Sequence, residues 1–380
     1  MLVLANPSQM NTTQKSTTQI KAGISLYCGT RPGEYFIGTN RVRIALYSDN
    51  AAGIFGALKA GLNPAEIAAT YSLGAGELDG LIEELIACEF LETQTSAIQI
   101  SERFISNIAE RAAKAGDHSK DASYSQIKKR ISPELSVTRW LPGVCDSGVS
   151  TVSARQSAHV EISGNSRAAQ HLYAALLASG VIHTQFAPSF RRGAETITEE
   201  DLIGGYVNAT DIGQVFTAFS REKSKSLALF PLPKVESAEE LPTGFAEKII
   251  KVHFGEIDPA ILGLWMASGQ EHLIVSEISG GYLTISPIVK PGLGPCSRCC
   301  ELTIADQSGA TILEGATVRD EIPVAGANYL AGLLAGQLLN FIDTGICTLS
   351  REAIAIDLLD LCKTKHIAIG RHPMCGCSWR

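Results

Sequence analysis

Four cysteines occur as two closely spaced pairs, a spacing that suits the binding of a metal ion. Cys296 and Cys299 form a C-x-x-C element in "GLGPCSRCC", and Cys375 and Cys377 form a C-x-C element in "HPMCGCSWR". The Pro and Gly that precede the first pair predict a tight turn, which lets two thiolates converge on one ion, and tetrahedral zinc takes four such sulfurs. A site with four protein ligands has no open position, so we expect a structural zinc ion. The alternative is two unrelated thiol pairs.

The chemistry of the other cysteines depends on the redox compartment of the chain. The start, "MLVLANPSQM", lacks the basic region of a signal peptide, and no apolar run reaches the roughly 18 residues of a membrane helix. We therefore expect a cytoplasmic protein without membrane contact, whose ten cysteines stay reduced. Those expected to be small buried side chains are Cys28, Cys88, Cys145, Cys347 and Cys362, and Cys300 is a spare beside the C-x-x-C element.

Composition excludes some classes of partner and of site. The chain has 380 residues, 19% of them charged and 45% hydrophobic, with a formal net charge of -7. This length predicts more than one domain, and the charge balance lacks the basic excess that attracts nucleic acid. No H-E-x-x-H, G-x-S-x-G or P-loop motif occurs, and the histidines form no ligand-spaced cluster. We therefore assign no catalytic residue.

The N-terminal part predicts three strands followed by three helices. Residues 1–19 are polar after the opening "LVLA" and are expected to be a disordered tail. Strand-like runs separated by turn sequences lie at 23–28, 34–39 and 41–47. Helical patterns begin at Asn50, at Asn63 and near Ala75. This order is that of a winged-helix module, which we place at residues 20–105.

The third predicted helix has an apolar stripe and an acidic surface. The stripe contains Leu78, Leu81, Ile82 and Leu85, and the acidic residues are Glu77, Asp79, Glu83, Glu84 and Glu89. A helix that reads DNA needs Arg or Lys at the base edges, and this helix has neither. An open sheet beside a helix can instead capture an extended peptide as an added strand. The alternative is a module that only caps the larger domain.

A second pattern begins after residues 106–155, which are polar and are interpreted as a connector. The run from His159, "HVEISGNSRAAQHLYAALLASGVIHTQF", predicts strand, glycine turn, helix and strand, the unit that starts a doubly wound α/β sheet at 156–380. The turn holds one glycine of a G-x-G-x-x-G motif, Gly164, so a phosphate chain cannot approach the backbone closely. Arg167 could meet a phosphate directly. Gly164 and Arg167 are therefore the candidate nucleotide-binding residues.

Later segments continue this domain. We expect "SLALFPL" to be a strand, "PAILGLWMASGQ" a helix, and "EHLIVSEISGGYLTISPIV" a hairpin with a Gly-Gly turn. The apolar run "GANYLAGLLAGQLLNFI" is interrupted by Gly, Asn and Gln, so we expect a core or dimer-interface helix and not a membrane span.

The ordered pair P-G-x-x-x-C-x-x-C and H-P-x-C-G-C is the most specific part of a family resemblance. The segments from "HLIVSEISGG" to "CSRCCELTIADQ" and "HPMCGCSW" resemble the zinc-bearing half of the E1-like (ThiF-like) proteins that work with YcaO enzymes in making azole- and azoline-containing ribosomal peptides. "TITEEDLIGGYVNATDIGQ" resembles a strand and loop of these proteins. The first hundred residues resemble their peptide recognition element, a winged helix that binds precursor leader peptides. The resemblance extends from about Ile20 to Trp379.

The resemblance implies an E1-like, Rossmann-type α/β domain with Zn2+ at the four paired cysteines. It also implies that a leader peptide adds a strand between the third strand and the third helix. The residues that it places at the peptide are Val42, Arg43, Ile44, Ala45, Leu46, Tyr47, Leu78, Leu81, Ile82 and Leu85. The YcaO cyclodehydratase, encoded separately because the chain stops after the zinc cysteines, would be the partner that consumes ATP. E1-like relatives commonly dimerise, so this chain could form a homodimer.

We therefore expect a non-catalytic subunit that presents a precursor peptide to a YcaO enzyme for conversion of Cys, Ser or Thr to azolines in bacteriocin-type biosynthesis. The alternative is a ThiF-type adenylyltransferase that activates a peptide carboxylate with ATP. Two features would distinguish these hypotheses. One is the glycine turn at Gly164, and the other is whether acidic residues such as Asp201 and Asp211 lie near a nucleotide. The degenerate glycine motif argues against ATP chemistry in this chain.

Overall fold

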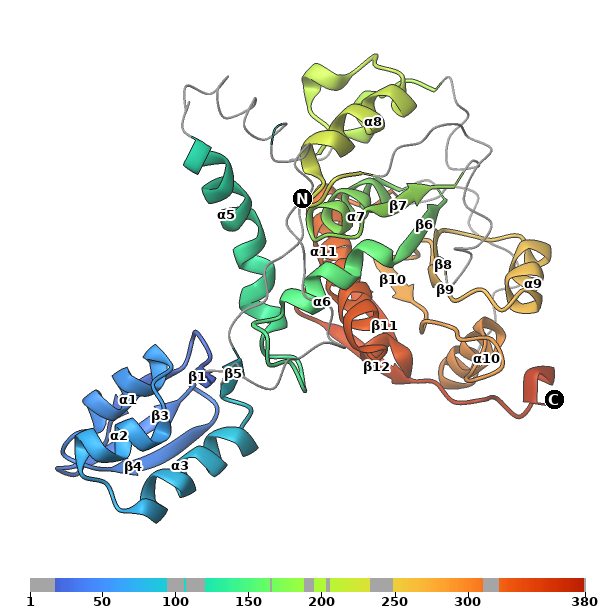
Figure 1. The fold of residues 1–380 in the computed structure, drawn as a ribbon. Coiled ribbons are helices and arrows are strands. Elements are labelled where there is room, and N and C mark those ends of the chain that lie inside the picture. The colour runs from blue at the N-terminus through green and yellow to red at the C-terminus, as the bar shows by residue number, and fades with distance from the viewer. Residues whose placement is uncertain are drawn as a thin grey trace. The chain divides into compact units, whose positions relative to one another are not determined.

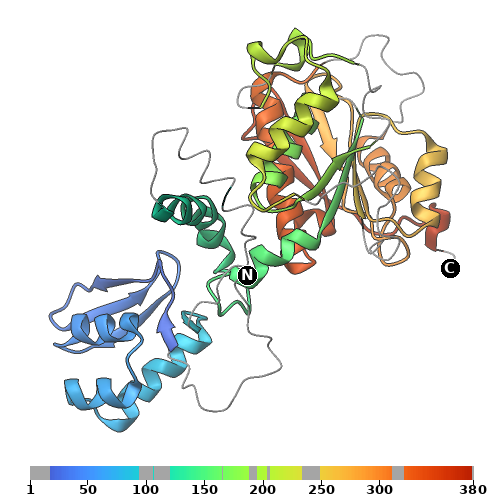
Figure 2. The ribbon, with the colours of Figure 1, turned by 45° about the horizontal axis from the view of Figure 1, so that its top comes forward.

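The computed structural model describes residues 18–93, 106, 120–164, 166–187, 195–202, 206–232, 249–309 and 321–378. Contacts within the chain divide it into two compact units, residues 1–153 and 154–380, which are drawn as ribbons in Figures 1 and 2. The predicted tail up to residue 17 and the stretch 107–119 of the predicted connector lie outside the described residues.

The first unit contains the predicted three strands and three helices in the predicted order. An antiparallel sheet has the order β2-β3-β4, formed by Ser25–Cys28, Glu34–Gly38 and Arg43–Tyr47. The helices that follow are α1 (Ala51–Ala60), α2 (Pro64–Tyr71) and α3 (Ala75–Ala87). Helix α2 begins as its sequence predicts, because the Asn63 side chain accepts a hydrogen bond from the Ala65 N–H at 3.0 Å and Pro64 occupies the first helical position.

The sequence did not predict the two-stranded antiparallel sheet of β1 (Thr18–Ile20) and β5 (Leu91–Thr93). Strand β1 includes two residues that were expected to belong to the tail. The next residue, Lys21, is buried and donates from Nζ to the carbonyl oxygen of Arg139 at 2.9 Å, just after α5 (Lys120–Thr138). This pairing and this hydrogen bond join the start of the described chain to two segments far along the first unit.

The second unit is built on a seven-stranded sheet of order β12-β11-β10-β9-β8-β6-β7. Strands β7, β6, β8 and β9 are parallel to their neighbours, whereas β9, β10, β11 and β12 pair antiparallel. The parallel strands are β6 (His159–Ser163), β7 (His183–Phe186), β8 (Ile249–Phe254) and β9 (His272–Val275). The others are β10 (Tyr282–Ile285), β11 (Glu352–Asp357) and β12 (Thr364–Ala368). The predicted unit of β6, α7 (Arg167–Ala178) and β7 is confirmed.

Helices cover both faces of this sheet (Figure 2). Helices α7 and α11 (Val324–Thr344) share one hydrophobic core with the sheet, and α10 (Ser297–Ser308) packs on the opposite face. Alternation along β11 separates the faces, because Ile354 and Ile356 belong to the first core while Ala353 packs with Cys300 of α10. The second unit also contains α8 (Phe216–Leu227) and α9 (Pro259–Ala267), and α6 (Val149–Ala154) ends the first unit.

Three of the four later predictions are confirmed and one is wrong. The helix α9 and the β9–β10 hairpin are present, with Gly280 and Gly281 at positive φ in its turn. Helix α11 is a core helix, and no helix among the described residues is both long and apolar enough to span a membrane. The segment "SLALFPL" is not a strand, because its first residues end α8 and the following Ala228, Leu229 and Phe230 are buried as loop residues. The apolar run fills the core without pairing in a sheet.

Candidate functional site

The four paired cysteines meet at one point in the second unit. Their sulfur atoms all lie within 4.8 Å of one another. Sγ of Cys296 lies 3.8 Å from that of Cys299 and 3.4 Å from that of Cys375, and Sγ of Cys299 lies 3.3 Å from that of Cys377. Zinc–sulfur bonds of about 2.3 Å in a tetrahedron place the sulfurs about 3.8 Å apart. The donor set and its spacing therefore fit a metal ion and are compatible with structural zinc.

Local structure prepares this cluster for a cation. Cys296 is the N-cap residue of α10 and Cys299 lies in its first turn, so the helix start aims both sulfurs to one side. Burial opposes ionisation of Cys299, but hydrogen bonds from the His372 N–H and from the neighbouring cysteines outweigh it and lower its pKa to about 7. Burial raises the pKa of Cys377 to about 12.

A hydrogen-bonded histidine positions the second ligand pair. The ring of His372 accepts the Met374 N–H at Nδ1, at 3.1 Å, so its Nε2 carries the proton and donates to Asp306 of α10 at 2.8 Å. This chain of contacts connects the segment that bears Cys375 and Cys377 to the helix that begins at Cys296. The hydrogen bond between His372 and Asp306 was not predicted from the sequence, although His372 belongs to the "HPMCGC" motif.

The other cysteines do not join the cluster. Burial raises the pKa of Cys300 to about 12, so this thiol stays neutral and packs between α10 and the sheet. The prediction that the five isolated cysteines are all buried is wrong, because Cys28, Cys145 and Cys362 are exposed. Cys28 ends an edge strand, Cys145 lies in a loop, and Cys362 lies in a turn. Of the remaining two, Cys347 is buried and Cys88 is half-buried.

In the first unit, β4 leaves one edge of the sheet open. The Thr39 N–H donates to the carbonyl oxygen of Val42 at 2.8 Å, which makes these two residues a hydrogen-bonded pair of the β3–β4 ladder. Such pairs alternate with pairs whose backbone groups point away from the partner strand. The register therefore directs the N–H and C=O groups of Arg43, Ala45 and Tyr47 outward. No described backbone group bonds them.

The predicted peptide-binding residues separate into exposed and buried groups. The exposed ones lie on the strand or just before it and are Val42, Arg43, Ala45 and Tyr47, the last with 73% exposure. Half-buried residues are Leu46 and Ile82. Core residues of the first unit are Ile44, Leu78, Leu81 and Leu85. The core residues attach α3 to the sheet, so their side chains are not available at the surface in this structure.

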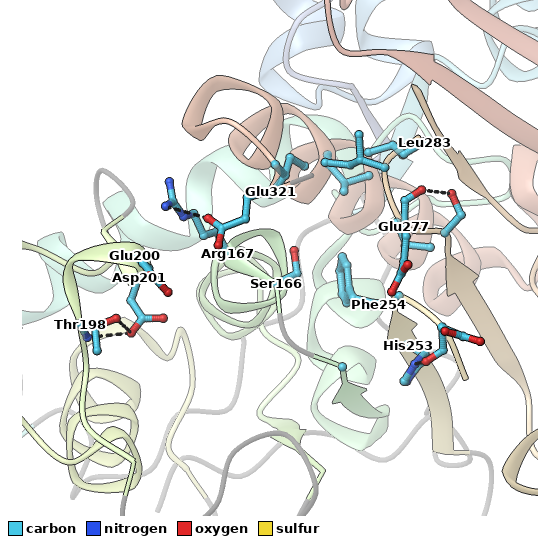
Figure 3. Close-up of a pocket in the computed structure, with 18 of the residues that line it drawn as sticks. Ser166, Arg167, Thr198, Glu200, Asp201, His253, Phe254, Glu277, Leu283 and Glu321 are labelled. Atoms are coloured by element: carbon cyan, nitrogen blue, oxygen red, sulfur yellow. Dashed lines mark hydrogen bonds and ion pairs between the residues drawn. The ribbon is translucent and has the colours of Figure 1, made fainter. Parts of the chain in front are cut away.

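The second unit has a cavity of about 870 Å³ at the carboxyl ends of β6, β8 and β9 (Figure 3). This is the edge at which open α/β sheets bind ligands. Among the described residues that line it, carboxylates predominate: Glu195, Glu200, Asp201, Glu256, Glu277 and Glu321. The one guanidinium, that of Arg167, lies 3.4 Å from a carboxylate oxygen of Glu321, and no lysine belongs to this lining. The sequence did not predict this acidic lining, because its carboxylates come from four separate segments.

The predicted nucleotide-binding residues both border this cavity. Gly164 has φ +79°, and a Cβ there would collide with the backbone carbonyl of Phe254, so this glycine is needed for packing of the turn against β8. Asp201 lines the cavity, but its carboxylate accepts from the Thr198 N–H at 2.9 Å and from Nε2 of Gln170 at 3.1 Å. Asp211 is not among the lining residues and forms an ion pair with Lys223 at 3.3 Å.

Comparison with solved structures identifies the fold of the whole chain. No protein-family model and no curated protein matches this chain. A structure of MccB from E. coli with succinimide superposes with a TM-score of 0.61 at 13% identity, covering 94% of this chain and 98% of that one. The microcin C7 biosynthetic enzyme MccB in complex with N-formylated MccA gives 0.62 at 13%, covering 94% and 98%. PaaA gives 0.60 at 11%, covering 93% and 100%. These similarities support the E1-like, Rossmann-type α/β fold that the sequence resembles.

Proposed function

We propose that this chain binds the leader of a ribosomally made precursor peptide and presents it to a separately encoded YcaO cyclodehydratase. The observation that carries this proposal is the open edge of β4 beside α3. An extended peptide placed there could bond the outward groups of Arg43, Ala45 and Tyr47. Strand addition would cover an edge that is otherwise open to aggregation. MccB, which has this fold, was solved in complex with N-formylated MccA.

Tethering explains how such a chain could contribute without catalytic groups. A bound leader raises the effective concentration of the attached core peptide at a partner enzyme, by an amount that the linker length sets. The second unit would then serve as a scaffold, in which zinc at the four cysteines joins the C-terminal segment to α10. The YcaO partner, a homodimer and a cytoplasmic location stay predictions.

The charge of the cavity argues against a nucleotide in the second unit. A triphosphate is a polyanion, and proteins bind it with backbone N–H groups, Lys, Arg and Mg2+. Among the described residues of the lining, six are carboxylates, and the one guanidinium is paired with one of them. Gly164, in the turn between β6 and α7, is needed for packing against β8. It is the one glycine of the partial motif, so no second glycine allows a phosphate to approach the backbone closely.

A ThiF-type adenylyltransferase is the second candidate function. The position of the cavity favours it, because doubly wound sheets bind nucleotides at the carboxyl ends of their strands. MccB was also solved with ATP, with a TM-score of 0.58 to this chain at 13% identity. An acidic cavity could accommodate ATP if divalent cations neutralised the carboxylates first.

Substitution of Ala45 by proline tests peptide capture at β4. The Ala45 N–H points away from β3, so Ala45→Pro removes an outward donor while the β3–β4 ladder keeps its hydrogen bonds. We expect peptides selected on the wild-type chain from a random display library to lose affinity by about tenfold or more. Fluorescence anisotropy of the labelled peptides measures this loss.

Ala45→Thr is the matched control, since threonine keeps the N–H and suits a strand. Its affinity should stay within about twofold of wild type, and circular dichroism should show both variants folded. Equal binding by wild type and Ala45→Pro would reject strand addition at this edge.

Calorimetric titration with Mg-ATP separates the two candidate functions. We expect no detectable heat, because the carboxylates of the cavity repel the triphosphate. Micromolar binding would instead assign ATP chemistry to this chain. If the wild type does bind, Glu321→Gln, which removes one carboxylate and releases Arg167 from its ion pair, should bind Mg-ATP more tightly.

Metal analysis tests the role of the cysteine cluster. We expect one zinc per chain, lost in Cys375→Ala, with a fall in melting temperature of about 5 °C or more because a structural zinc contributes several kcal/mol. Cys300→Ala is the control, since Cys300 is buried beside the cluster without belonging to it. It should keep its zinc. A wild-type chain that holds no zinc and keeps its melting temperature in a chelator would contradict the assignment.

A further inference from the structure

Helix α3 places carboxylates beside the open edge of β4. The helix packs on β4 and carries four acidic residues with exposed side chains, Glu77, Asp79, Glu83 and Glu84. Glu77 accepts a hydrogen bond from the Gly74 N–H at 3.2 Å and so caps the helix. The other three form no ion pair with any residue that the structure describes. A helix wall with unneutralised negative charge therefore borders the edge.

Both flanks of α3 are acidic. With 100° between successive residues, the buried residues Leu78 and Leu85 mark the face that packs on the core. Leu81 is buried as well, so Asp79 lies on one flank, Glu84 lies on the other, and Glu83 lies on the face opposite the core. Whichever flank borders a peptide added to β4, the peptide meets a carboxylate.

The strand does not supply compensating positive charge toward the helix. Arg43 is the one cation in β4, and its guanidinium lies over the ring of Tyr27 at 4.2 Å. Its Nε also donates to the Thr39 carbonyl oxygen at 3.3 Å. Arg43 is thus held over the sheet of the first unit. It does not neutralise α3.

Apolar side chains are also exposed, on α3 and, on the opposite face of the sheet, at Tyr47. Ile86 of α3 is 59% exposed, and Ile82 lies one turn before it and is half-buried. On β4, Tyr47 is 73% exposed, and Val42 just before the strand is 46% exposed. A peptide that adds to this edge could bury these side chains with its own apolar residues at alternate positions.

We propose that the segment captured at β4 is a basic, amphipathic peptide, which carries Lys or Arg opposite α3 and apolar residues at alternate positions. This inference rests on the proposed peptide-binding function and specifies its ligand. Carboxylates of α3 that form no ion pair with the described residues would gain one in the complex. The binding should therefore weaken with ionic strength.

Selection from a random-peptide display library on the full-length, zinc-loaded chain tests the inference. Peptides that fail to bind the Ala45→Pro variant are kept, and their composition is compared with that of the starting library. We expect enrichment in Lys and Arg. Synthetic copies with Lys and Arg replaced by Gln should bind about threefold to tenfold more weakly.

A charge-matched pair of variants separates local from general electrostatics. Asp79→Asn/Glu84→Gln removes one carboxylate from each flank of α3 and should weaken the selected peptides roughly two- to tenfold. Asp49→Asn/Glu66→Gln removes the same charge from residues outside α3 and should leave their affinity within about twofold.

The outcomes distinguish the inference from the function on which it rests. Selected peptides without basic enrichment, or equal affinities for the two double variants, would overturn the charge assignment while peptide capture at β4 stands. Failure to enrich any peptide that depends on the β4 edge would overturn both. Enrichment in basic residues together with selective loss in the α3 variant supports the inference.

Discussion

Four thiols within 4.8 Å of one another constrain the second unit more than any other local feature. At this distance thiolates would repel one another, and neutral thiols would form only weak hydrogen bonds. A cation at the centre of the four sulfurs would therefore stabilise the arrangement. The cluster joins the start of α10 to the segment after β12, and Cys300, beside Cys299, packs α10 onto β11 and β12. A metal ion there would fix a helix, a sheet face and the C-terminal segment together, which is why we assign the site a structural role.

The two units differ in what their charges permit. In the second unit the sheet keeps the cavity position at which doubly wound folds bind ligands, but carboxylates from four described segments line it. In the first unit the acidic surface lies on α3, beside a strand whose outward N–H and C=O groups have no described partner. The same sign of charge thus disfavours a polyanion in one unit and favours a basic peptide at the other.

Local sequence patterns predicted most helices and strands, but they did not predict which distant segments come together. The Asn63-Pro64 pair predicted the start of α2, and the Gly-Gly sequence predicted the β9–β10 hairpin, because cap and turn chemistry act within a few residues. The "SLALFPL" strand was wrong because an apolar run does not reveal whether it pairs in a sheet or fills a core. The acidic cavity and the Asp306–His372 contact bring together segments that are distant in sequence, so no local pattern predicts them.

Amide hydrogen exchange, resolved by residue with NMR, tests strand addition at β4 most directly. In the free chain the amides of Ile44 and Leu46 should be protected by β3, while those of Arg43, Ala45 and Tyr47 exchange fast. Binding of a library-selected peptide should slow the latter three by at least about tenfold. Unchanged exchange at these three amides, or protection confined to the opposite edge strand β2, would contradict the account.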